Sequence, residues 1–168
     1  MNGERADALD GGCTCGQVRY RLLRRPMLVH CCHCRWCQRE TGSAFVLNAL
    51  IERDQLQVLQ GRTGTVTVPT HSGRGQKIER CPHCQVALWS HYPGGGDAIA
   101  FVRVGTLDTP EALPPDTHIY TASRLPWVTI PEGVAAFAEF YDPRTQWSAQ
   151  TRQRYRDGQA RASGATPA

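Results

Sequence analysis

The sequence lacks the features that would place a protein in a membrane or a secretory pathway. Its 168 residues contain no run of 18 apolar residues, so no segment is predicted to be a transmembrane helix. The polar start, Met1–Asp7, has mixed charge and no apolar stretch of the kind found in a secretory signal. We therefore expect a protein of the reducing cytoplasm with no membrane partner, and its length favours a single folded domain.

Strong amphipathic helix patterns are also missing, and short strands dominate instead. Only residues 35–40 suggest a helical turn or two, ended by Gly42. Gly61 and Gly64 predict a hairpin connection between two of the strands. The five prolines between Pro110 and Pro131 favour extended segments and turns. The sequence thus predicts a mainly β domain with about seven strands, at 17–22, 27–30, 45–51, 56–60, 65–68, 87–89 and 98–104.

The C-terminal segment has no Ile, Leu, Val, Met or Phe from Arg144 to Ala168. Such a segment cannot bury enough apolar surface to fold alone, and we expect Trp147 and Tyr155 to fix at most one or two helical turns. The last ten residues are expected to be disordered. The predicted organisation is a flexible N-terminus (1–10), a folded domain (11–143) and an Arg-rich, partly disordered tail (144–168).

The formal net charge of +4 belongs entirely to that tail, which holds five arginines and one aspartate. The remaining chain is formally neutral. A nucleic-acid partner is therefore not expected, although the basic composition by itself suggests one.

The chain has eight cysteines, which in a reducing compartment indicate metal or thiol chemistry rather than disulfides. Cys13 and Cys15 form a C-x-C pair whose period-two spacing places both thiols on one face. Cys81 and Cys84 form a C-x-x-C knuckle, a common half of a zinc site. Together the two pairs predict a structural zinc with four thiolate ligands, which would cross-link distant parts of a small β domain.

A second cluster lies in the centre of the chain, where Cys32, Cys34 and Cys37 offer three thiols within six residues. Three protein ligands and an open fourth position distinguish catalytic from structural zinc sites. Alternatively, Cys31 or His33 fills the fourth position and the site is structural. Cys31 is the poorer fourth ligand, because adjacent side chains in an extended chain point to opposite faces. Zinc is favoured over iron by the thiolate set.

Other residues give weaker evidence about the functional site. Arg35 and Arg39 are candidates for stabilising the negative charge of the second site, although Arg39 also suits a solvated face. Trp36 and Trp127 suit a pocket or, more commonly, core packing. The glycine clusters lack the context of a phosphate-binding loop. Isolated histidines are more typical of surface or hydrogen-bonded positions than of metal ligands; these are His30, His71, His91 and His118.

Several motifs in order resemble the glutathione-dependent formaldehyde-activating enzyme family, also called the centromere protein V family. They are the segments 12–20, 32–45, 80–84, 104–108 and 118–120. The resemblance covers about residues 10 to 140 and implies that residues 11–143 form a zinc-binding domain with an Mss4-like, all-β fold. We expect this fold to consist of short antiparallel strands and to hold two zinc ions, one of them structural. It assigns the structural zinc to Cys13, Cys15, Cys81 and Cys84, and the catalytic zinc to Cys32, Cys34 and Cys37.

One position departs from the family pattern, since Gln85 follows Cys84 where family members usually have glycine. Glycine there would ease a tight turn with positive φ, so the turn after Cys84 is expected to differ. The resemblance implies a zinc-dependent carbon–sulfur lyase of the S-(hydroxymethyl)glutathione synthase type, with glutathione or a similar thiol and an aldehyde as its partners. The competing hypothesis is a non-enzymatic binding module with two structural zinc sites, because a fold alone does not give function.

Overall fold

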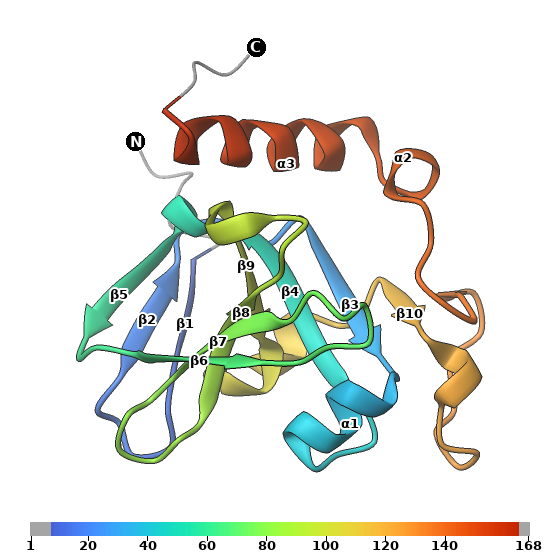
Figure 1. The fold of residues 1–168 in the computed structure, drawn as a ribbon, viewed down its shortest axis with the longest axis horizontal. Coiled ribbons are helices and arrows are strands. Elements are labelled where there is room, and N and C mark those ends of the chain that lie inside the picture. Colours follow the sequence, from blue (N-terminus) through green and yellow to red (C-terminus); the bar gives the residue numbers. More distant parts are fainter. Residues whose placement is uncertain (1–7, 165–168) are drawn as a thin grey trace.

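The computed structural model describes residues 8–164 and shows a mainly β protein with two sheets (Figure 1). Period-two burial is clear in the smaller sheet, where Tyr20 and Leu22 are fully buried and the arginines between and before them are not. This sheet is antiparallel and consists of β1 (Leu9–Gly12), β2 (Arg19–Leu22) and β5 (Leu56–Gln60), in the order β1-β2-β5.

The larger sheet has eight strands in the order β11-β10-β3-β4-β9-β8-β7-β6. Its central strands are buried on both faces, which explains their nearly continuous apolar sequences. The strands are β3 (Leu28–Cys32), β4 (Val46–Glu52), β6 (Gly64–Val68), β7 (Gln76–Arg80), β8 (Ala87–His91), β9 (Ile99–Arg103), β10 (Thr117–Ile119) and β11 (Ala135–Ala136). The expected mainly β class is confirmed, and it is consistent with the Mss4-like fold.

Two details of the expected topology are wrong. β5 and β6 form no hairpin, because β5 pairs with β2 and β6 pairs with β7. Gly61 lies between them with φ of +75°, and a side chain there would meet the Gln17 carbonyl, so this turn carries the chain from one sheet to the other. In addition, β10 pairs in parallel with both β3 and β11, so the strands are not all antiparallel.

The predicted short helix is α1 (Arg35–Thr41), and both of its ends have a local cause. The Cys34 thiol caps its start by accepting the Cys37 N–H, and Gly42 ends it with a φ of +64°. Short 3-10 turns follow at Arg53–Gln55, Gly96–Ala98, Val104–Thr106, Pro110–Ala112 and Thr121–Ser123. Two of them lie between Pro110 and Pro131, as the prolines suggest.

The C-terminal segment is more ordered than the sequence suggests. After α2 (Pro143–Gln146), α3 (Ala149–Ala162) runs for 14 residues along one end of the sheets (Figure 1). Arg154 forms a two-bond ion pair with Glu52, whose side chain is only 1% exposed, and Arg161 pairs with Asp54. Ion pairs and the aromatic side chain of Tyr155 therefore dock this helix. Its sequence has no apolar stripe from which the docking could be predicted. Residues 165–168 of the expected disordered end lie outside the described residues, as do residues 1–7 of the expected flexible start.

Candidate metal centres and an aromatic cavity

The first cysteine cluster lies between the two sheets. Cys13 and Cys15 follow β1 in the smaller sheet, whereas Cys81 and Cys84 lie between β7 and β8 in the larger one. The four Sγ atoms all lie within 4.8 Å of one another. Cys15 Sγ is 3.4 Å from Cys13 Sγ and 3.7 Å from Cys81 Sγ. A metal ion held by this set would join the two sheets.

The turn after Cys84 keeps the geometry that glycine would favour. Gln85 has a φ of +61° and is one of two residues other than glycine with positive φ in the described chain. Its N–H donates to the Cys81 carbonyl at 3.0 Å, which closes the knuckle. The expectation of a different turn is therefore wrong in its geometry: the left-handed conformation remains, and the glutamine bears the steric cost.

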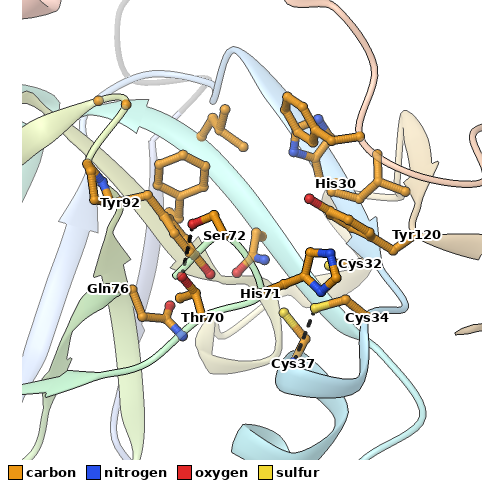
Figure 2. A pocket seen from close by; sticks show the side chains of 18 of the residues that line it. His30, Cys32, Cys34, Cys37, Thr70, His71, Ser72, Gln76, Tyr92 and Tyr120 are labelled. Atoms are coloured by element: carbon orange, nitrogen blue, oxygen red, sulfur yellow. Dashed lines mark hydrogen bonds between the residues drawn. The ribbon is translucent and has the colours of Figure 1, made fainter. Parts of the chain in front are cut away.

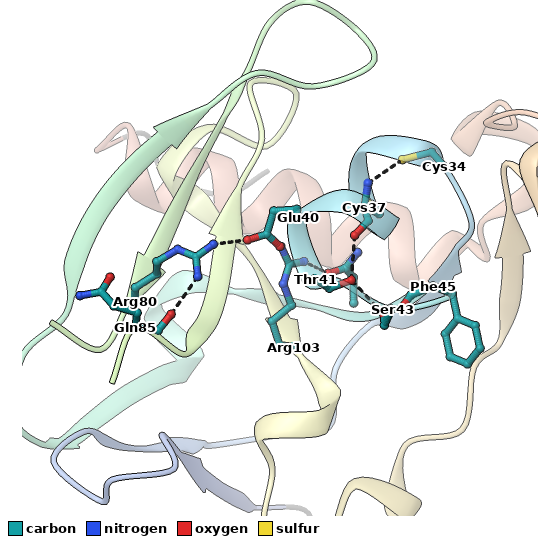
Figure 3. Close-up of polar contacts among 10 residues, drawn as sticks. Cys34, Cys37, Glu40, Thr41, Ser43, Phe45, Arg80, Gln85 and Arg103 are labelled. Carbon is teal, nitrogen blue, oxygen red and sulfur yellow. Dashed lines mark hydrogen bonds and ion pairs between the residues drawn. The ribbon is translucent and has the colours of Figure 1, made fainter. Parts of the chain in front are cut away.

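The second cluster brings together Cys32 from the end of β3, Cys34 before α1 and Cys37 within α1. Their Sγ atoms also lie within 4.8 Å of one another, and all three side chains are buried. Cys34 Sγ accepts the Cys37 N–H at 3.4 Å (Figure 3). The sharp turn from strand to helix is thus what makes the three thiols converge.

The three thiols differ in their tendency to ionise. Hydrogen bonds from the Cys32 thiol and then from Cys37 lower the pKa of Cys34 to about 2. Its bond to Cys34 is the main cause that raises the pKa of Cys32. For Cys37 the bond to Cys32 lowers the pKa, but the interaction with Cys34 and burial outweigh it and raise the value to about 12. Three thiolates can therefore coexist here only with a cation among them, which is the donor set that suits a metal ion.

The protein's own cation near this cluster is Arg103 of β9, whose positive charge acts to lower the pKa of Cys37. Its side chain is 7% exposed, donates to the Asn48 amide oxygen and pairs with Glu40 (Figure 3). Arg35 and Arg39, the candidates from the sequence, are exposed instead, and Arg35 bonds Gln38. In the sequence, the position of this arginine within the apolar run 98–104 is the feature that could have predicted its burial.

Cys31 and His33 belong to a different group of side chains, on the opposite face of β3. Cys31 Sγ lies 3.5 Å from His33 Nε2, which is 2.9 Å from His118 Nδ1. These three atoms form a further set that can hold a metal ion. Neither alternative fourth ligand therefore joins Cys32, and His118 is a hydrogen-bonded histidine, as its isolated position in the sequence suggests.

A cavity of about 320 Å³ opens beside the second cluster, and all three of its cysteines line the wall (Figure 2). Trp36 of α1 also lines it and is 40% exposed, whereas Trp127 lies at the surface with 72% exposure. The expectation of core packing is wrong for both tryptophans. Gln76 lines the same cavity; it is 5% exposed, and its Oε1 has no hydrogen-bond partner among residues 8–164.

No helix in the described part of the chain has the length and apolar character needed to span a bilayer.

All eight cysteines are free thiols, with no disulfide between them. The site therefore presents four thiols between the sheets and three at a cavity wall, without competing covalent links.

Two known proteins are similar to parts of this chain. The chain is 27% identical over 127 residues to a curated Halomonas elongata protein named "Putative glutathione-dependent formaldehyde-activating enzyme", which covers 73% of this chain and 80% of that protein. The crystal structure of a Rhodobacter sphaeroides protein matches with a TM-score of 0.43 and 19% identity, over 59% of this chain and 87% of the other.

The model of one family, the glutathione-dependent formaldehyde-activating enzymes, matches residues 8–123. That span contains both cysteine clusters, every strand except β11, and the motifs that carry the sequence resemblance. The chain therefore belongs to the glutathione-dependent formaldehyde-activating enzyme family.

Proposed function

We propose that this protein is a zinc-dependent carbon–sulfur lyase that forms and breaks thiol–aldehyde adducts, of the S-(hydroxymethyl)glutathione synthase type. The observation that carries the proposal is the position of the second cluster. Three buried thiols, Cys32, Cys34 and Cys37, converge on one wall of a cavity large enough for a small ligand. A set of three protein ligands beside an open space is typical of catalytic rather than structural zinc.

The two clusters have different roles in this proposal. Cys13, Cys15, Cys81 and Cys84 hold a structural zinc that joins the sheets. Cys32, Cys34 and Cys37 hold a second zinc, which supplies a Lewis acid that lowers the pKa of a coordinated thiol. Arg103 offsets the negative charge of the three thiolates, and its bond to Glu40 fixes its position.

The reaction is an addition without net oxidation. The thiol sulfur forms a bond to the aldehyde carbon, the carbonyl π electrons move to oxygen, and the proton lost by the thiol ends on that oxygen. The reverse reaction removes the hydroxyl proton, restores the carbonyl and breaks the carbon–sulfur bond. The partners are a small-molecule thiol and an aldehyde. We also propose the cytoplasm as the location, where a reducing environment keeps all eight thiols free.

Cobalt substitution tests this proposal at the second site. Full-length protein loaded with Co²⁺ is titrated with glutathione and with other thiols up to millimolar concentration. We expect the sulfur-to-cobalt absorption to change as a thiol coordinates, and Cys34→Ser to abolish the change. NMR exchange between free aldehyde and its thiol adduct then measures the reaction. If no thiol alters the cobalt spectrum, the enzyme proposal is wrong and the zinc-stabilised binding module is supported.

A further inference from the structure

The cavity beside the second cluster differs from a site built for a highly charged ligand. We propose that it takes a thiol–aldehyde adduct whose larger part is an uncharged, ring-sized apolar group with a hydrogen-bond donor, rather than the tripeptide of glutathione. This inference rests on the proposed function and concerns only the class of substrate. Its basis is the lining of the cavity, which includes seven aromatic side chains.

Aromatic rings from α1, from the strands and from the segments between them line the cavity. Trp36 projects from α1, one residue before Cys37, and is 40% exposed. Tyr92 and Phe101 also line the cavity and pack edge to face with ring centroids 4.7 Å apart. Tyr120 packs against the buried cluster that contains Cys34, and its ring meets the His71 ring edge to face (Figure 2). Its φ of +56° is an unusual conformation for a bulky residue. Rings in these positions offer a ligand large, rigid apolar contact surfaces.

The C-terminal segment adds aromatic residues to the cavity wall from beyond the part of the chain that the family model matches. Trp147 and Tyr155 line the cavity with ring centroids 5.1 Å apart, and both lie beyond residue 123, where the family match ends. Phe140 adds another ring from the segment before α2 and is 46% exposed. Exposed aromatic side chains gathered around a cavity suggest a ligand that covers them.

The polar groups of the cavity are few and mostly neutral. Histidines apart, Arg74 is its one formally charged residue besides the cysteines, and no described carboxylate lines it. Glutathione carries two carboxylates and one ammonium at neutral pH. Its ammonium would find no acidic partner here and one carboxylate would lack a cation, and unpaired charges in a largely apolar site are costly.

Gln76 indicates what the ligand must offer instead. Its side chain is 95% buried at the cavity wall, and its Oε1 accepts no hydrogen bond from any described residue. A buried acceptor without a partner costs free energy, which a ligand hydroxyl or N–H can recover. The second cluster, the aromatic rings and Gln76 therefore favour a neutral group with one hydrogen-bond donor. Arg74, at the exposed side of the cavity, could pair with at most one carboxylate.

Competition between two thiols tests this inference on the full-length, Co²⁺-loaded protein. Benzyl mercaptan represents the apolar ring without the additional donor for Gln76, and glutathione represents the charged class. We expect half-saturation of the cobalt spectral change at a concentration at least about tenfold lower for benzyl mercaptan. Equal or tighter binding of glutathione overturns the inference but leaves the proposed function intact. A cobalt spectrum that responds to neither thiol contradicts the proposed function itself.

Variants of the wall give a second readout. Trp36→Ala removes an exposed ring and is expected to raise the half-saturation concentration for benzyl mercaptan at least about fivefold, with a smaller effect for glutathione. Arg35→Ala, the exposed neighbour on α1 that does not line the cavity, is the matched control and should change neither value. Tyr155→Ala should act like Trp36→Ala, whereas Tyr155→Phe keeps the ring and the affinity. Unchanged binding in Trp36→Ala overturns the role of the aromatic wall.

Discussion

The Glu40 carboxylate on α1 pairs with the guanidinium of Arg80, the residue directly before Cys81 (Figure 3). Its second oxygen lies 3.4 Å from Nη2 of Arg103. One carboxylate thus connects the helix of the second cysteine cluster to the strand that leads into the first. Because the side chains of Glu40 and Arg103 are 11% and 7% exposed, this network is much less screened than a surface ion pair.

Removing the negative charge of Glu40 should destabilise the folded protein. Glu40→Gln leaves two guanidinium groups, Arg80 and Arg103, without their anionic partner. We expect it to lower the free energy of unfolding of the zinc-loaded protein by about 3 kcal/mol, as when one partner of a buried pair is removed. Urea denaturation followed by circular dichroism measures this. The control is Lys77→Gln, which breaks the exposed pair with Asp97 and should cost less than about 1 kcal/mol. Equal effects of the two variants would contradict the structural role of Glu40.

The turn at Gln85 predicts a stabilising substitution. Gln85→Gly should raise the free energy of unfolding by about 1 kcal/mol, because glycine adopts the φ of +61° without a steric penalty. The lost side-chain bond from Gln85 Nε2 to the Pro82 carbonyl is exposed and offsets little of this gain. Thermal unfolding checks the expectation. Gln85→Ala is the matched comparison, since it removes the same bond but keeps the Cβ, and should not stabilise the protein.

The metal content separates the three groups of potential ligands. We expect two zinc ions per chain, one per chain in Cys34→Ser, and two in Cys31→Ser. Zinc held by Cys31, His33 and His118 would carry a net positive charge in a buried site, where burial, the main cause, and the positive charge of Arg124 lower the pKa of both histidines. Mass spectrometry of the native protein counts the ions. A loss of one zinc in Cys31→Ser would show instead that the third group binds metal.

The docking of α3 can be tested at Gly158, the buried residue of this helix. A Cβ on Gly158 would lie 3.2 Å from Glu52 Cγ and 3.3 Å from Ile99 Cδ1. Gly158→Leu should therefore displace the helix, weaken the pair between Arg154 and Glu52, and cost about 2 kcal/mol. Hydrogen exchange should show faster exchange confined to residues 149–162. Arg156→Leu adds the same side chain at an exposed position of α3 and should leave the exchange unchanged; similar protection in both variants would refute this docking mode.

Local sequence features determined much of this protein. Alternating and continuous apolar runs are enough to locate most strands. The pattern of apolar residues within a strand shows which of its faces are buried, as in β2 and β4. Cysteine spacing likewise predicts which thiols share a site. One set is Cys13, Cys15, Cys81 and Cys84, and the other is Cys32, Cys34 and Cys37. Ligand spacing is informative because short turns such as the one before α1 fix thiol positions locally.

Other properties depended on contacts that no local pattern contains. The partner of β5, the burial of Arg103 beside Cys37 and the cavity wall formed by Tyr155 all join residues far apart in the chain. α3 is the clearest case, since its sequence has no apolar stripe and resembles a disordered tail. It is held by arginines that pair with Glu52 and Asp54, which only the tertiary structure brings beside this helix. Hydrophobic periodicity records what a segment buries, whereas the ion pairs and cavities that shape this site exist only between segments.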